Sequence, residues 1–310
     1  MRLRELSRSD LRSHLEGAGI DVRTGGFTCR IRSPLADVAE NLALLYADCL
    51  AAPASGFADF HVRVAPPRGL RRWWRPQVLF HFDDRVPFKP LPRGQAVPML
   101  EWGLNWCVSN HAHQYLILHA AVIEKDGRAL VLPARPGSGK STLCAALVAR
   151  GWRLLSDELG LIDLRDRTVA PLARPINLKN ASIAIIRERA NGAVFSPLFH
   201  DTSKGTVALM RPPTESVARS LEPAHPAWIV AVQYEAGAAL RFAAQSKARM
   251  FMHVADCAFN YSLLGRDAFV ALSAVMDQAE CYTLCYSRLD EAIDVIESLG
   301  VASPLRVAAR

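Results

Sequence analysis

Several kinds of segment are missing from this sequence of 310 residues. No uncharged apolar run reaches the roughly 18 residues that a membrane-spanning helix needs, so no such span is expected. The first ten residues carry charges with no apolar stretch behind them, which predicts that they are not a secretory signal. Neither an internal repeat nor a low-complexity segment is found. These absences favour a globular, cytoplasmic protein of one or two domains over a membrane, solenoid or disordered one.

Cysteine is present but lacks the spacing of a metal site or a redox pair. The seven cysteines are an odd number and none forms a C-x-x-C pair, so free thiols in a reducing compartment are expected. Cys281 and Cys285 lie in a strand-like run that would point both to one side, where they read as core thiols.

An excess of positive charge is also lacking outside one short window. The formal net charge is +7, and residues 61–75 hold five arginines and no acid, which leaves the remainder close to neutral. A nucleic-acid-binding surface normally spreads its basic residues over a face, so no nucleic-acid partner is expected. The cluster of arginine and tryptophan at 68–75 is either a solvated turn or a docking site for a partner protein.

The pattern of apolar residues predicts an α/β protein with a boundary near residue 92. Residues 1–92 read as a small α+β region, with strands at 27–31, 60–64 and 77–82 and a helix at 35–50. Three prolines, at 87, 90 and 92, end this region, and residues 93–310 form the second, larger domain.

The second domain is expected to begin with a helix, a hairpin and a glycine-containing loop. A helix is predicted at 96–110, and strands at 115–124 and 128–133 flank Asp126 and Gly127, a pair typical of two-residue hairpin turns. The next helix covers 143–150, with Gly151 at its C-terminal end. Further strands are expected at 153–156, 159–164, 228–234 and 281–286, helices at 181–189, 247–261 and 267–276, and a proline-rich loop at 211–226. Ser287 and Asp290 match a capping box for the last helix.

The loop before the helix at 143–150 has the composition of a phosphate-binding loop. Residues 134–141, A-R-P-G-S-G-K-S, match the pattern G-x-x-x-x-G-K-[ST] except at its first glycine, here Ala134. Glycine lets backbone N–H groups approach phosphates, lysine supplies a mobile cation, and the hydroxyl can bind Mg²⁺. Because an apolar strand precedes the loop and an apolar helix follows it, nucleotide binding is expected. The residues predicted to contact the ATP phosphates are Pro136, Gly137, Ser138, Gly139, Lys140, Ser141 and Thr142.

Other candidate site residues are weaker on sequence alone. Asp157 follows Lys140 by 17 residues at a strand end, where it could serve phosphoryl transfer or simply form a turn with Glu158. His119, in the middle of an apolar strand, is either a core residue or a site residue. Lys179 and Lys204 are either surface lysines or candidate substrate contacts.

The order and spacing of these elements resemble the catalytic domain of bacterial HPr kinase/phosphorylase. His119 precedes the start of the loop by 15 residues, and residues 150–158, R-G-W-R-L-L-S-D-E, are similar to the family's segment that ends in two acids. The resemblance covers about residues 116–162. It is greatest to the HprK-related kinases (HprK-related kinase A), which have segments similar to 175–180, P-I-N-L-K-N, and 201–207, D-T-S-K-G-T-V.

The resemblance implies a fold and an activity. The fold would be the P-loop kinase core shared with phosphoenolpyruvate carboxykinase, a mixed sheet with flanking helices. The activity would be that of an ATP- and Mg²⁺-dependent protein serine kinase, acting on a small carrier protein or peptide, HPr-like or PqqD-like. Asp157 would accept the serine proton, His119 would tune its charge, and Ser141 with Glu158 would hold Mg²⁺.

Departures from the family pattern limit what carries over. Ala134, Thr142 and Glu158 replace the family's usual glycine, glutamate and second aspartate, and the signature of the reverse reaction is not found after Arg174. Kinase activity is therefore expected and phosphorylase activity is not. A small-molecule hydroxyl kinase and a non-catalytic ATP sensor stay as alternatives, and a homo-oligomer is left open.

Overall fold

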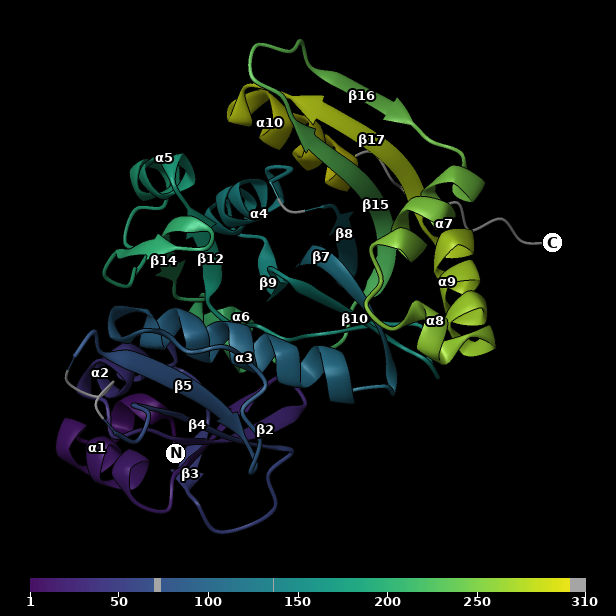
Figure 1. Cartoon of the computed structure of the whole chain (residues 1–310). Coiled ribbons are helices and arrows are strands. Elements are labelled where there is room, and N and C mark those ends of the chain that lie inside the picture. The colour runs from purple at the N-terminus through teal and green to yellow at the C-terminus, as the bar shows by residue number, and fades with distance from the viewer. Residues whose placement is uncertain (70–73, 136, 302–310) are drawn as a thin grey trace.

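The mixed α/β class expected from the sequence is what the chain adopts. The computed structural model describes residues 1–69, 74–135 and 137–301, and these form three sheets with helices packed around them (Figure 1). Pro136 and, in the arginine and tryptophan cluster, Arg71, Arg72 and Trp73 lie outside the described residues.

The N-terminal sheet has the strand order β3-β1-β2-β4-β5-β6. In β2 the alternate residues Phe27, Cys29 and Ile31 are buried, as expected of a sheet with one face on a core. Helices cover that face, and η3 (Arg93–Gln95) leads from β6 into the third helix. The elements are η1 (Leu3–Glu5), α1 (Arg8–Glu16), β1 (Ile20–Thr24), β2 (Phe27–Arg32), α2 (Ala36–Leu45), β3 (Ala51–Pro53), β4 (Phe60–Ala65), β5 (Gln77–Phe82), β6 (Leu91–Pro92) and α3 (Ala96–His111).

The central sheet has the order β11-β10-β7-β8-β15-β17-β16, with β9 paired to β7. It is mixed, since β15 runs parallel to β8 and β17 whereas β7 and β8 form an antiparallel hairpin. The hairpin turns at Asp126 and Gly127, both with positive φ, as the sequence predicted. The strands are β7 (Tyr115–Lys125), β8 (Arg128–Pro133), β9 (Arg153–Ser156), β10 (Leu159–Asp163), β11 (Val169–Ala170), β15 (His225–Tyr234), β16 (Arg241–Ala244) and β17 (Glu280–Tyr286).

Helices cover both faces of the central sheet (Figure 1). One face packs on α4 (Lys140–Ala149) and α10 (Leu289–Val301), with α5 (Ala181–Arg189) packed against α4, and the other on α7 (Lys247–Asp256), α8 (Tyr261–Leu264) and α9 (Arg266–Gln278). A third sheet, in the order β12-β14-β13, lies beside α5. Its strands are β12 (Ile176–Lys179), β13 (Phe199–Thr202) and β14 (Gly205–Met210).

The predicted ends of three helices are wrong, because contacts with distant segments end the helix early or replace the expected cap. The helix expected at 35–50 stops at Leu45, since Ala47 and Cys49 turn back to accept hydrogen bonds from Arg4 and Leu3. The helix expected at 247–261 stops at Asp256, because residues 257–259 extend to bond β7. The capping box is absent: α10 begins at Leu289, and the Ser287 hydroxyl donates to the Ala238 carbonyl instead.

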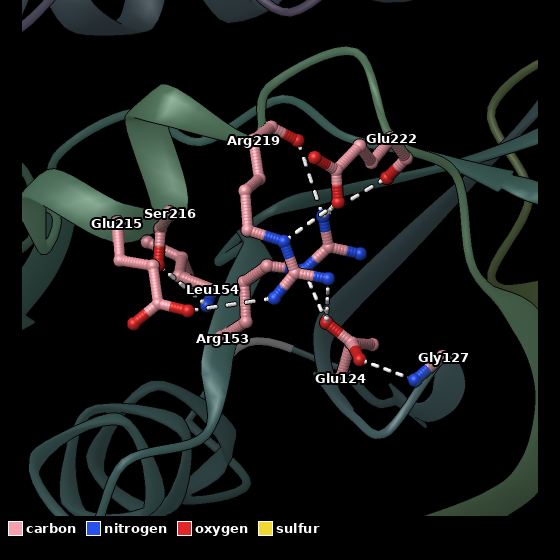
Figure 2. A network of polar contacts seen from close by, with 8 residues as sticks. All are labelled: Glu124, Gly127, Arg153, Leu154, Glu215, Ser216, Arg219 and Glu222. Carbon is pink, nitrogen blue, oxygen red and sulfur yellow. Dashed lines mark hydrogen bonds and ion pairs between the residues drawn. The ribbon is translucent and has the colours of Figure 1, made fainter.

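The stretch 211–226, expected to be a loop, contains the short helix α6 (Thr214–Ala218) and the start of β15. Hydrogen bonds and ion pairs with Arg153 and Glu124 join it to the central sheet, as Figure 2 shows. Arg153 on β9 donates to the Glu124 carboxylate on β7 and, 3.1 and 3.0 Å away, to the carbonyls of Arg219 and Glu222. Arg153 and Glu124 are both almost fully buried, so the charge of each offsets the cost of removing the other from water.

Contacts run across the expected boundary at residue 92. Helix α3, which follows the boundary, packs on β4 and β5 of the N-terminal sheet. One hydrophobic cluster joins Leu3 and Phe60 to Leu159 and Leu209. The division into 1–92 and 93–310 stays a prediction of the sequence.

In the part of the chain that the structure describes, no helix is both long and apolar enough to cross a membrane. The seven cysteines are unpaired there, and all except Cys285 are buried, in agreement with the expected free thiols.

Candidate functional site

The glycine-containing loop lies between the end of β8 at Pro133 and the start of α4 at Lys140. Gly137 and Gly139 have φ values of 89° and 87°, which L side chains rarely adopt. A Cβ atom on Gly139 would also lie 2.6 Å from the Tyr286 hydroxyl oxygen and 2.8 Å from the Tyr234 Cβ. Glycine is therefore required at 139 by both conformation and space.

Two tyrosines from neighbouring parallel strands hold the loop in place. The Tyr234 backbone N–H, at the end of β15, donates to the Ser138 carbonyl at 2.9 Å. The Tyr286 hydroxyl, at the end of β17, donates to the Gly139 carbonyl at 3.2 Å. Ser138 and Gly139 are thus fixed directly before the first turn of α4, the end of a helix where backbone N–H groups are left free.

A cavity of about 730 Å³ opens in front of the loop. Of the predicted site residues, ten line it: His119, Gly137, Ser138, Gly139, Lys140, Ser141, Thr142, Glu158, Lys179 and Lys204. Asp157 lies behind this cavity and lines a small one of about 20 Å³, of which Glu158 and Asn177 are also part. Pro136 lies outside the described residues. The fold thus brings together residues that are up to 85 positions apart, such as His119 and Lys204.

His119 and Lys140 face each other in the cavity. The Lys140 ammonium lies 3.3 Å from the His119 Nε2 atom, and Lys140 is buried. Burial and then the positive charge of Lys140 lower the pKa of His119 to about 4. His119 is therefore neutral near pH 7, and Nε2 can accept a hydrogen bond from the lysine.

Asp157 is buried, and its two carboxylate oxygens have different surroundings. Oδ2 accepts a hydrogen bond of 3.0 Å from the Asn177 backbone N–H. Oδ1 has no hydrogen-bond partner among the described residues. Burial raises the pKa of Asp157, against the opposing effects of the Lys140 charge and of the hydrogen bond from the Asn177 backbone. This carboxylate can therefore take up a proton more readily than an exposed one.

Glu158 is more accessible than Asp157, and its pKa is shifted in the opposite direction. Burial tends to raise its pKa, but Lys204, Lys140 and Lys179 together lower it. The Asn105 side-chain amide donates to Oε2 at 2.9 Å, and the Lys204 ammonium lies 3.7 Å from Oε1. Two adjacent carboxyl groups with pKa values shifted in opposite directions are typical of sites where one holds a charge and the other exchanges a proton.

Lys179 and Lys204 come from the third sheet. Lys179 ends β12, and Lys204 lies in the turn between β13 and β14, over the ring of Trp102 at 5.1 Å. Burial, followed by the charge of Lys204, lowers the pKa of Lys179. The two ammonium groups therefore add positive charge to the wall of the cavity that faces Glu158.

Some site residues were not predicted. Asn177 lines both cavities and belongs to the segment 175–180, so its resemblance to the kinase subgroup was a usable signal. Tyr234 and Tyr286 end strands that were expected, but nothing in the sequence shows that the two strands end at the loop. Asn105 reaches Glu158 from α3, 53 positions earlier in the chain, and no local pattern marks it.

The donor atoms suit Mg²⁺ bound together with a nucleotide. No group of three or more His, Cys, Asp or Glu residues that could hold a metal ion is found among the described residues. Mg²⁺ usually needs only one or two protein oxygens besides water and phosphate oxygens. Ser141 and Glu158 both line the cavity beside Lys140, so the residues fit Mg²⁺ with ATP rather than a metal held by protein alone.

No protein-family model and no curated protein matches the sequence. Among solved structures, the Hpr(Ser) kinase/phosphatase from Coxiella burnetii matches 60% of this chain and 99% of its own, with 12% identity and a TM-score of 0.28. This likeness is too slight to assign an activity, so the function has to be inferred from the residues of the site itself.

Proposed function

We propose that this protein is an ATP- and Mg²⁺-dependent kinase that transfers the γ-phosphate to a serine hydroxyl of a small carrier protein or peptide. One observation carries the proposal. A glycine loop at a helix N-terminus, the buried lysine Lys140 and the buried carboxylate of Asp157 lie together at one end of the central sheet. Phosphoryl transfer needs these parts, because its catalysis is mainly positioning and charge stabilisation.

The loop and Lys140 would bind the nucleotide phosphates. Gly137 and Gly139 leave the backbone bare toward the cavity, and α4 points its N-terminal end there. The Lys140 ammonium, already buried beside neutral His119, would move toward the β- and γ-phosphate oxygens. His119 would keep the lysine oriented without adding a second positive charge.

Ser141 and Glu158 would hold Mg²⁺, which neutralises charge that develops on the phosphates. Ser141 supplies a hydroxyl from the first turn of α4, and Glu158 supplies a carboxylate that lines the same cavity. The lowered pKa of Glu158 keeps it ionised, as a metal ligand has to be.

Asp157 would accept the proton of the serine hydroxyl. Its raised pKa favours proton uptake, and Oδ1 is free to accept a hydrogen bond while Asn177 fixes Oδ2. Lys179 and Lys204 would contact the acceptor, which by resemblance is an HPr-like or PqqD-like protein. The reverse, phosphate-consuming reaction is not part of the proposal.

One observation favours the opposite roles for the two acids. Glu158 lines the main cavity, whereas Asp157 lines only the small one beside it. Substitution separates the two assignments. If Asp157 is the base, Asp157→Asn keeps the Mg²⁺ dependence of nucleotide binding and Glu158→Gln weakens it. If the roles are exchanged, the effects on Mg²⁺ dependence are exchanged as well.

The function is tested by incubating the protein with labelled ATP, Mg²⁺ and small proteins that co-purify with it. Transfer of label to a serine is expected, and Asp157→Asn should lower its rate about 10²- to 10⁴-fold. Asp277→Asn, at an exposed position of α9, is the matched control and should transfer label normally.

Other results would point to the alternatives. ATP consumption that depends on a metabolite, with no labelled protein, would indicate a small-molecule hydroxyl kinase. Tight ATP binding without turnover on any acceptor would indicate a sensor. Normal transfer by Asp157→Asn would show that Asp157 is not the base.

A further inference from the structure

Helix α3 belongs to the N-terminal sheet by its packing but also forms part of the wall around the two acids. It lies between that sheet and the central one (Figure 1). Glu101 and Asn105 on α3 line the small cavity together with Asp157 and Glu158. The N-terminal region thus supplies side chains to the immediate surroundings of the site.

The orientation of the Asn105 amide is fixed by Arg174. The Arg174 guanidinium donates to the Asn105 Oδ1 atom at 2.8 Å, and a guanidinium can only donate hydrogen bonds. The amide oxygen therefore has to face Arg174, which directs the NH₂ group to Glu158. There it donates to Oε2 at 2.9 Å, and an ionised carboxylate can only accept.

Arg174 is itself held on several sides. Its guanidinium donates to the Glu101 carboxylate at 2.7 Å and to the Glu101 carbonyl at 3.0 Å. The Tyr46 hydroxyl donates to the same carboxylate at 2.6 Å and accepts from the Arg174 Nε atom at 3.3 Å. Arg174, Glu101 and Tyr46 are all buried, so the network is rigid and screened from water.

From this chain of contacts we infer that Asn105 is a positioning residue for Glu158. The inference rests on the proposed function, in which Glu158 holds Mg²⁺. The Asn105 amide holds Oε2, while Oε1 is left facing Lys204 and the cavity. Without the amide, Glu158 can rotate toward Lys204 or out into the cavity, and Mg²⁺ binding loses a preorganised ligand.

The test measures how Mg²⁺ strengthens the binding of a fluorescent ATP analogue to the full chain. Asn105→Ala should raise the Mg²⁺ concentration at half-maximal effect about tenfold or more. Binding of the analogue in EDTA should stay unchanged, because the loop and Lys140 are untouched. Asn110→Ala is the matched control, since Asn110 is exposed on the same helix and its side chain, among the described residues, bonds only Trp106 and Ser109 of its own turn.

A double-substitution cycle separates positioning from general damage. In a Glu158→Gln background, Asn105→Ala should add almost nothing to the shift in Mg²⁺ dependence, because the carboxylate that it positions is gone. If alanine prevents folding, Asn105→Leu, of similar volume, carries the same test. An unchanged Mg²⁺ dependence in Asn105→Ala, or a full further shift in the Glu158→Gln background, would overturn the inference alone. Failure of the unmodified chain to bind the analogue, or to respond to Mg²⁺, would overturn the proposed function instead.

Discussion

The role of His119 depends on neighbours that are distant in the sequence. In the sequence it is one polar residue in an apolar strand, a setting in which a histidine is more often a core residue than a site residue. In the fold its ring lies beside the Lys140 ammonium and edge-on to Phe259, 5.8 Å between ring centres, at the wall of the cavity. The strand could be predicted, but the neighbours of His119 come from the loop and from residue 259, which only the fold brings near.

The lowered pKa of His119 predicts how stability depends on pH. The unfolded chain protonates this residue near pH 6.5, whereas the folded chain does so only near pH 4. Between these values the unfolded state binds more protons, so the free energy of unfolding falls as the pH falls. His119→Gln should make the free energy of unfolding less dependent on pH in this window. Urea unfolding at pH values from about 7 to about 4 measures it.

His200→Gln is the control for that prediction. His200 is exposed, so its replacement should leave the pH dependence as it is in the unmodified protein. An equally steep pH dependence in His119→Gln would show that other groups account for it.

The site residues that the sequence could reveal are close together in the chain, whereas those that it could not reveal are far apart. The loop residues are contiguous, so their pattern is visible in the sequence. Glu101, Asn105 and Arg174 meet only because α3 packs against the segment after β11, and each looks like an ordinary polar residue of its own element. A motif search cannot find a hydrogen-bond chain whose links lie about 70 positions apart.

At the scale of elements, the turn from β8 into α4 depends on Gly139. Gly139→Ala is expected to weaken nucleotide binding strongly and to destabilise the protein. The positive φ alone costs about 1–2 kcal/mol, and the new methyl group would also collide with Tyr286 and Tyr234. Binding of a fluorescent ATP analogue and urea unfolding measure the two effects.

Gly192→Ala separates conformation from collision. Gly192 also has a positive φ, 79°, but no atom lies within 4 Å of where its Cβ would be. It should show only the conformational cost and bind the nucleotide normally. Equal losses in the two variants would mean that the tyrosine contacts do not constrain the loop.

The ends of elements were predicted less well than the elements themselves. Apolar periodicity placed α3, β7, β8 and α9 within a few residues. It could not show that the chain leaves α7 at Asp256 to bond β7, where the Asn260 side chain accepts from the Ile117 N–H and donates to the Tyr115 carbonyl, both at 2.9 Å. Likewise β12 and β14 were missed, because each is short and their pairing joins residues about 30 positions apart.

The ion pair between β9 and β7 gives a prediction about how elements are held together (Figure 2). Arg153→Met should lower the free energy of unfolding by about 3–5 kcal/mol, because it leaves the buried Glu124 carboxylate without its main partner. Arg219→Met is the matched control: Arg219 is about one-third exposed and reaches the same carboxylate at 3.7 Å, so about 1 kcal/mol or less is expected. Urea unfolding measures the free energy of unfolding of both variants. Similar decreases in the two would contradict the prediction that Arg153 is the main partner of Glu124.

At the scale of the whole molecule, hydrogen bonds and ion pairs connect the N-terminal region to the larger part of the chain. Asp48, in the turn after α2, accepts from the Arg211 guanidinium at 3.1 Å and from the Thr214 hydroxyl at 2.7 Å. The Gln95 amide donates to the Asp201 carbonyl at 2.8 Å, beside the turn that carries Lys204. The same α3 helix that covers the N-terminal sheet also supplies Asn105 to Glu158. Stability and the geometry of the site are thus joined across the proline cluster at 87–92.

The shared core predicts that the protein unfolds in one step and that residues 113–310 do not fold alone. Ile117, Leu161 and Leu209 of the larger part lie in the same buried cluster as Val64 and Leu104, so removing residues 1–112 would expose them to water. Urea transitions followed by tryptophan fluorescence and by far-UV circular dichroism should coincide. The isolated 113–310 segment should aggregate or bind a hydrophobic dye. Two separate transitions, or a monomeric 113–310 segment that binds ATP with the affinity of the whole chain, would show that the N-terminal region is an independent attachment.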